Sequence, residues 1–203
     1  MNNVSFFIDG FNLYHALDSR QYYHKYKWLN LNSLANCFTT KNDKVTSILY
    51  FTALAHWDPS KVKRHQLFIT ANETHGVQTI YGEFKRKDKR CPICHRRYHT
   101  FEEKQTDVNI ALFLFRYAIQ EKYDKAFIVS GDSDLIPAIK AVKNTFPQKE
   151  IGVIIPIGRR SESLKQSCDF HMKMKEKHLQ ASVFDKKLIL SNNQELICPS
   201  SWC

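Results

Sequence analysis

The 203-residue sequence lacks any apolar stretch near the ~20 residues needed to span a bilayer, and it has no repeat or low-complexity tract. It also lacks a basic segment ahead of an apolar run at its start, since MNNVSFFIDG leads directly into an acid. No segment has the pattern of a strongly amphipathic basic helix. These absences argue against a membrane partner and a signal peptide, and they favour a cytoplasmic protein. Its 43% hydrophobic and 25% charged residues are typical of one globular domain.

Acidic residues are in short supply. The chain has 20 Asp and Glu against 30 Lys and Arg, for a net charge of +10. Such an excess favours a polyanionic partner, because neutralising phosphates releases counterions and adds affinity. A basic surface without a partner is the alternative.

Short apolar runs alternate with longer helical patterns, which predicts an α/β fold with a central, mainly parallel sheet. We expect strands at 4–8, 45–54, 77–84, 126–130 and 151–156, an edge strand near 170–174, and helices at 58–72, 102–122 and 133–144. Residues 85–101 interrupt this pattern with a basic, cysteine-bearing insert. We therefore expect one domain over 1–185, with the insert at 85–101, and a peripheral tail at 186–203.

The few acids include three at the ends of predicted strands. Asp9 follows VSFFI, and Asp132 and Asp134 follow AFIVS. In an open parallel sheet, ligands bind outside the carboxyl ends of the strands. Gly10 allows the sharp turn that this requires, and Asn12 can reach the same crevice. Alternatively, these acids only cap the helices that follow.

Asp107 is a candidate site residue for a different reason: it lies on the apolar stripe of a predicted helix. That stripe comprises Ile110, Ala111, Leu114 and Ala118. A carboxylate on a buried-facing stripe costs free energy unless it is paired, hydrogen-bonded or bound to metal. An ion pair with Lys104 or Arg116 is the alternative.

Four acids held close together would repel one another and would stay ionised only around a divalent cation. Oxygen-only ligands favour Mg²⁺ or Mn²⁺ over zinc. Such an ion can activate water and stabilise an in-line phosphoryl displacement. With the basic surface, this pattern indicates phosphodiester hydrolysis.

Three segments, in this order and spacing, carry a family resemblance: FFIDGFNLYHAL, EEKQTDVNIALFLFRYA and YDKAFIVSGDSDLIPAIKAV. The chain resembles the NYN domains of the PIN-like nuclease superfamily, in the LabA-like branch, over roughly residues 4–185. The resemblance implies a Rossmann-like (PIN-like) three-layer fold, a Mg²⁺ or Mn²⁺ site and RNA cleavage. By position it implies Asp9, Asp107 and Asp132 as direct metal ligands and Asp134 as a direct or water-mediated one. Asn12 would be an accessory polar group, and Ser130 would line the site.

The insert contains Cys91-Pro-Ile-Cys94, which has the C-x2-C spacing of a zinc knuckle. Cys91, Cys94 and His99 are three candidate zinc ligands. The fourth stays open between His95, His75 and a residue of another copy. Two reduced thiols in a basic loop are the alternative.

The insert and one further loop also hold candidate phosphate contacts. Tyr98 and Phe101 are available there for base stacking. A solvated charge run is the alternative. The cations are Lys85, Arg86, Lys87, Lys89, Arg90, Arg96 and Arg97 in the insert, and Arg159 and Arg160 after the strand at 151–156.

These observations predict a metal-dependent ribonuclease that acts on single-stranded RNA. Two alternatives stay open: a nucleic-acid-binding regulatory module without turnover, and a small-molecule phosphohydrolase. The choice between RNA and DNA, and the oligomeric state, including a homo-oligomer, are also open.

Overall fold

Six strands form one fully parallel sheet at the centre of the computed structural model, which describes residues 1–190 and 193–202. The strand order is β3-β2-β1-β6-β7-β8. This is the doubly wound, Rossmann-type order, so the predicted fold class is confirmed. The strands are β1 (Asn2–Asp9), β2 (Asp43–Thr52), β3 (Val77–Tyr81), β6 (Lys125–Val129), β7 (Glu150–Ile155) and β8 (Phe170–Lys173).

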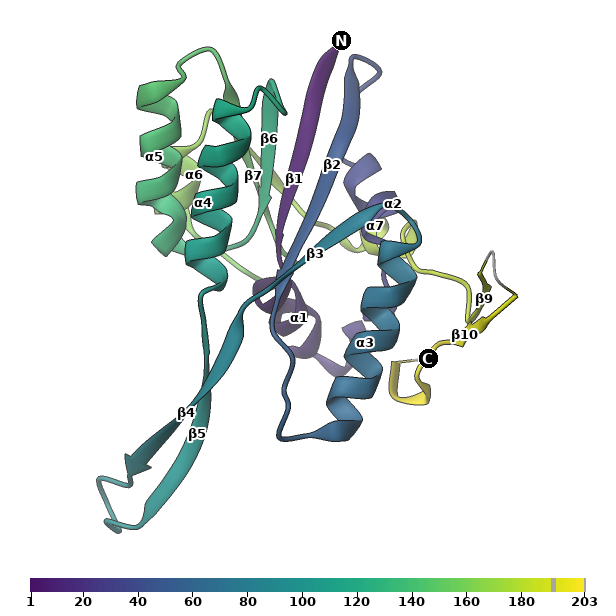
Figure 1. Cartoon of the computed structure of the whole chain (residues 1–203), viewed down its shortest axis with the longest axis vertical. Helices are drawn as coiled ribbons and strands as arrows, with labels where there is room; N and C mark the ends of the chain where they lie inside the picture. The colour runs from purple at the N-terminus through teal and green to yellow at the C-terminus, as the bar shows by residue number, and fades with distance from the viewer. Residues whose placement is uncertain (191–192, 203) are drawn as a thin grey trace.

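Helices cover both faces of this sheet and make it the middle of three layers (Figure 1). The helices are α1 (Gly10–Asp18), α2 (Leu31–Asn36), α3 (Pro59–Glu73), α4 (Thr106–Ile119), α5 (Ile136–Thr145), α6 (Glu162–Ser167) and α7 (Glu176–Gln180). Three short 3-10 helices complete them: η1 (Gln21–Tyr26), η2 (Ser133–Leu135) and η3 (Ser200–Trp202).

The two faces of the sheet have separate apolar cores, as the alternation along β1 shows. Phe6 and Ile8 belong to the core under α1, α2, α3 and α7, whereas Phe7 belongs to the core under α4, α5 and α6. Asp9 has the same strand parity as Phe7. Its side chain therefore starts toward the face that α4 covers.

The basic insert is an antiparallel hairpin, β4 (Glu83–Arg90) and β5 (Arg97–Lys104), which projects from the domain as an arm (Figure 1). Two expected boundaries are wrong here. The third sheet strand ends at Tyr81, before the predicted position 84, and the helix expected from 102 starts at Thr106. The reason is cross-strand pairing, since Glu102, Glu103 and Lys104 pair with β4. Gln105 then has a positive φ of 75° and separates strand from helix.

The tail, expected to be peripheral, contributes side chains to the domain. Strands β9 (Lys187–Ile189) and β10 (Glu195–Ile197) form a small antiparallel pair. Leu196 and Cys198 are buried in the core beneath α1, α2 and α3.

Within residues 1–190 and 193–202, no helix combines the length and the apolar character that crossing a bilayer requires.

Candidate functional site

The predicted crevice lies where β1 and β6 run side by side at the centre of the sheet. The strand order reverses direction at this point, which is where doubly wound sheets place their ligands. Asp9 ends β1, and the S-G-D-S-D segment follows β6. The structure therefore brings Asp9 and Asp132 to the same edge of the sheet.

Hydrogen bonds tie these two strand ends together. The buried Asp9 carboxylate accepts from the Asn12 N–H at 2.9 Å and from the Ser130 hydroxyl at 2.8 Å. The same hydroxyl accepts from the Asp132 N–H at 3.0 Å, and the Asn12 side-chain oxygen accepts from the Gly131 N–H at 3.0 Å. Asn12 and Ser130 thus hold both strand ends in register.

Gly10 sets the entry of α1 into the site. A Cβ at this position would lie 2.6 Å from the Phe51 carbonyl oxygen and 2.7 Å from the Tyr50 ring. Only glycine lets α1 approach β2 this closely. The approach fixes Asp9 at the floor of the crevice.

The capping interpretation is also confirmed, and it is compatible with a site. Asp9 caps α1, and Asp132 caps η2 by accepting from the Asp134 N–H at 2.9 Å. A carboxylate has about four lone-pair positions, so a capping bond leaves others free for a ligand.

Asp107 lies in the first turn of α4, next to these acids, and makes no ion pair within the described residues. Lys104 instead pairs with Glu102, and the Arg116 guanidinium lies over the Phe113 ring. The ion-pair alternative is therefore wrong for the described part of the chain.

Glu103 is a fifth acid at the site, and sequence reasoning missed it. It comes from β5 of the arm, and its Oε1 is buried with no hydrogen-bond partner among the described residues. We expected Glu103 within the helix at 102–122 and did not expect its side chain at the site. No periodicity within the segment would have found it, because its place depends on pairing with Phe84 on β4.

Burial and neighbouring charges raise the pKa of Asp9, Glu103 and Asp107. Burial and the charges of Asp9 and Asp107 raise the pKa of Glu103 to about 8. Partial loss of hydration, with the charges of Asp9, Asp132 and Asp134, raises the pKa of Asp107 to about 6. Burial also raises the pKa of Asp9, against the hydrogen bonds from Asn12 and Ser130. Keeping these carboxylates ionised therefore costs free energy, and a bound cation would remove that cost.

These shifts predict a pH-dependent stability without added metal. Glu103 and Asp107 bind protons more tightly in the folded chain than at their ordinary pKa values of 4.5 and 3.8. Their protonation thus stabilises the fold fully below about pH 4, and this contribution is lost as the pH rises through about 6 and 8. Relative to a Glu103→Gln/Asp107→Asn variant, the wild type should lose free energy of unfolding from pH 4 to pH 8. Urea denaturation in EDTA measures this difference, and a constant difference would contradict the interaction.

The donor set suits a hard divalent cation, because Asp9, Glu103, Asp107 and Asp132 offer carboxylate oxygens that include the orphan Oε1 of Glu103. As their side chains lie, no three His, Cys, Asp or Glu residues of the described chain converge closely enough to hold an ion. Side-chain rotation at the cavity rim would therefore accompany binding.

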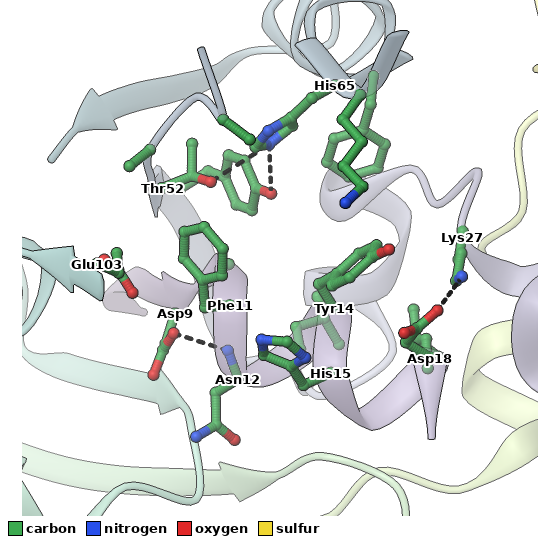
Figure 2. Close-up of a pocket in the computed structure, with 18 of the residues that line it drawn as sticks. Asp9, Phe11, Asn12, Tyr14, His15, Asp18, Lys27, Thr52, His65 and Glu103 are labelled. Carbon is green, nitrogen blue, oxygen red and sulfur yellow. Dashed lines mark hydrogen bonds and ion pairs between the residues drawn. The ribbon is translucent and has the colours of Figure 1, made fainter. Parts of the chain in front are cut away.

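Asp9, Glu103, Asp107 and Asp132 line a cavity of about 640 Å³. Figure 2 shows Asp9 and Glu103 together at one end of it. Arg159 also lines it, and its Cβ lies 3.3 Å from where a Gly131 Cβ would be. Asp134 and Arg160 are exposed and do not line this cavity. Phe101, Trp57 and Phe84 form an aromatic base for the arm, with Trp57 stacked on Phe101 at 3.8 Å.

Several arm cations are paired with acids on the surface. The bonds are Lys85 to Glu83 at 3.0 Å, Arg86 to Asp88 at 3.4 Å, and Lys87 and Lys89 to Glu102 at 2.9 and 3.5 Å. The Arg90 Nε donates to the His95 carbonyl at 3.1 Å. Arg96 and Arg97 make no ion pair with the described residues and leave the arm tip positive.

Cys91 and Cys94 lie together at the arm tip as free thiols. Backbone N–H groups of Cys94 and Ile93 donate to Cys91 and lower the pKa of its thiol. His99 lies further along β5 against Phe101, with ring centroids 5.8 Å apart. The described residues do not gather it with the cysteines into a three-ligand group, so zinc stays a prediction.

A solved structure supports the fold. A protein of unknown function from Vibrio parahaemolyticus has a TM-score of 0.59 and 18% identity, over 86% of this chain and 94% of that one. A curated relative is 28% identical over 104 residues, which are 50% of this chain: a 6-hydroxy-3-succinoylpyridine 3-monooxygenase from Pseudomonas putida. The chain spans about a third of the length of that relative.

The NYN domain family matches residues 3–175, which include both strand ends, the arm and α4. The match covers most of the chain, whereas membership of the LabA-like branch stays a prediction. This chain therefore belongs to the NYN domain family, and with it to the PIN-like nuclease superfamily.

Proposed function

We propose that the protein is a metal-dependent ribonuclease that hydrolyses phosphodiester bonds of single-stranded RNA. The observation that carries the proposal is the cluster of Asp9, Glu103, Asp107 and Asp132 at the centre of the sheet. Burial and neighbouring negative charges raise the pKa of three of these acids, Asp9, Glu103 and Asp107. Such a cluster is expensive unless a cation binds there. Asp9, Asp107, Asp132 and Glu103 would hold Mg²⁺ or Mn²⁺.

The bound ion would supply an activated water and would neutralise charge on the phosphate under attack. The chain's own residues prepare the site. Ser130 and Asn12 orient Asp9 and the Gly131–Asp132 turn by hydrogen bonds of 2.8 to 3.0 Å. Arg159, beside the acids, attracts the phosphate. The positive arm adds non-specific contacts to the backbone.

The named activity of the Pseudomonas relative is not proposed for this chain, because the match covers only a third of that protein. A small-molecule phosphohydrolase would explain the acids. It would not explain the arm, which has eight Lys and Arg against four Asp and Glu over residues 83–104.

Metal removal tests the proposal directly. The protein is purified by size-exclusion chromatography, and each fraction across its peak is incubated with end-labelled single-stranded RNA. The incubations contain Mn²⁺, Mg²⁺ or EDTA. We expect cleavage that co-elutes with the protein, disappears in EDTA and returns with added Mn²⁺. Cleavage that persists in EDTA, or elutes apart from the protein, would contradict the proposal.

A further inference from the structure

Asp9 and Glu103 lie at one end of the cavity, and Asp18, which is ion-paired with Lys27, lies at the other (Figure 2). The opposite end lies between α1 and α3, where Tyr14, His15 and His65 face the same space (Figure 2). The volume of about 640 Å³ falls within the ~300–1,000 Å³ of small-ligand sites. A metal ion and a few waters, at roughly 30 Å³ of liquid volume each, would leave most of it free.

Aromatic rings form much of the wall at this second end. Tyr50 is buried beneath it, with its ring 5.6 Å from Phe68 in an edge-on contact. Tyr14 on α1 keeps 38% of its surface exposed, and the Lys27 Nζ lies over its ring at 5.1 Å from the centroid. An aromatic ring in a cavity wall offers a surface on which a planar heterocycle stacks.

The fixed polar groups of the wall are already paired. The His65 Nε2 lies 3.2 Å from the Tyr50 hydroxyl and 3.2 Å from the Thr52 hydroxyl. Burial lowers the pKa of His65 to about 4, so the imidazole is neutral at physiological pH. This network shapes the wall and adds no charge to it.

Other polar groups are free to meet a ligand. Within the described residues, neither the His15 ring nor the Tyr14 hydroxyl has a hydrogen-bond partner. Burial and the nearby Arg159 lower the pKa of His15, which keeps the ring neutral with one donor and one acceptor. A donor and an acceptor beside a stacking face match the polar edge of a nucleobase.

Positively charged side chains line the cavity between this end and the acids. Lys61 and Arg64 on α3 and Arg159 line the same cavity. Lys27 is ion-paired with Asp18, and Lys61 is ion-paired with Asp58 at 3.5 Å. Among the residues that the structure describes, Arg64 has only a 3.4 Å contact to the Ser60 hydroxyl, which leaves its charge available to a phosphate.

We propose that the end of the cavity between α1 and α3 holds one unstacked nucleobase of the substrate, whose flanking phosphate lies toward the acids. This inference rests on the proposed function and names its substrate class. A base inside a duplex is stacked and paired on all sides, so it cannot enter the cavity without being extruded. The site thereby selects single-stranded substrate by shape.

Binding of mononucleotides in EDTA tests the pocket without any turnover. Titration calorimetry with AMP and with UMP is expected to detect saturable binding to the wild type. Tyr14→Ala should weaken it roughly tenfold through the lost stacking, whereas Tyr14→Phe, which keeps the ring, should stay within about threefold. Tyr22→Ala, an exposed tyrosine outside the cavity, is the matched control and should bind as the wild type does.

A second pair of variants distinguishes binding of the phosphate from binding of the base. Arg64→Gln should weaken AMP roughly tenfold and leave adenosine unchanged, while Lys63→Gln, one residue away and exposed, should change neither. Urea denaturation verifies that all variants are folded. Absence of binding to the wild type, or equal binding by Tyr14→Ala, would overturn the inference.

The two proposals fail separately. Tyr14-dependent nucleotide binding without RNA cleavage in any metal would refute the ribonuclease and leave the base pocket standing. Metal-dependent cleavage that Tyr14→Ala leaves unchanged, with the same preference for single strands over duplex, would refute the pocket alone.

Discussion

Asp9→Asn and Asp132→Asn are each expected to lower the rate of RNA cleavage on the order of 10³-fold, because a catalytic cation contributes several kcal/mol to transition-state stabilisation. Asparagine preserves the shape of each side chain and is as good a helix cap as aspartate. The caps on α1 and η2 therefore persist while the charge is lost. Single-turnover cleavage of labelled RNA in Mn²⁺ measures the effect.

Asp185→Asn is the matched control, since Asp185 is exposed, lies outside the cavity and undergoes the same change of charge. It should cleave at the wild-type rate. All three proteins should have similar midpoints of urea denaturation. Equal cleavage by the wild type and both site variants would assign the activity to a contaminant.

The strand-end acids could be predicted because their signal is local. Asp9 and Asp132 each follow a run of buried residues, and a parallel sheet brings such ends together whatever the connections are. Asp107 could be predicted from helical phase, although the helix begins four residues later than expected. Ile110, Leu114 and Ala118 are buried, and they set that phase.

Glu103 and the cavity could not be predicted in the same way, because they depend on contacts distant in sequence. Glu103 reaches the site through antiparallel pairing with Phe84 on β4. His65 reaches the cavity through its contacts with Tyr50 and Thr52 on another element. No periodicity within one segment encodes such juxtapositions.

Removal of the arm tip is expected to weaken single-stranded RNA binding by at least about 100-fold and to flatten its dependence on salt, by roughly 0.7 in log–log slope per lost phosphate contact. Arg86 and Phe101 are cross-strand partners, so an Asn-Gly turn can join them and replace Lys87–Thr100. The change deletes five cations and keeps Phe101 stacked on Trp57. Fluorescence anisotropy at several salt concentrations measures it.

Turnover of a small phosphodiester, bis(p-nitrophenyl) phosphate, should be unchanged in the same variant, since the acids stay in place. A Lys41→Gln/Lys44→Gln/Lys122→Gln variant is the control. It removes exposed lysines at the end of the sheet where the strands begin, which is opposite the acids (Figure 1). RNA affinity equal to that of the wild type after loss of the tip would exclude the arm as the nucleic-acid contact. It would also favour a small-molecule phosphohydrolase.

The two ends of the arm lie next to each other, since Glu83 and Lys104 are partners in the same ladder. The hairpin forms its own two-stranded sheet, separate from the central one. Beyond the Arg86–Phe101 pair, its length and sequence can therefore vary at little cost to the rest of the fold, because the entropy of closing a longer loop grows only slowly. Grafting another hairpin between Arg86 and Phe101 should change RNA binding and leave Glu103 and the other acids in place.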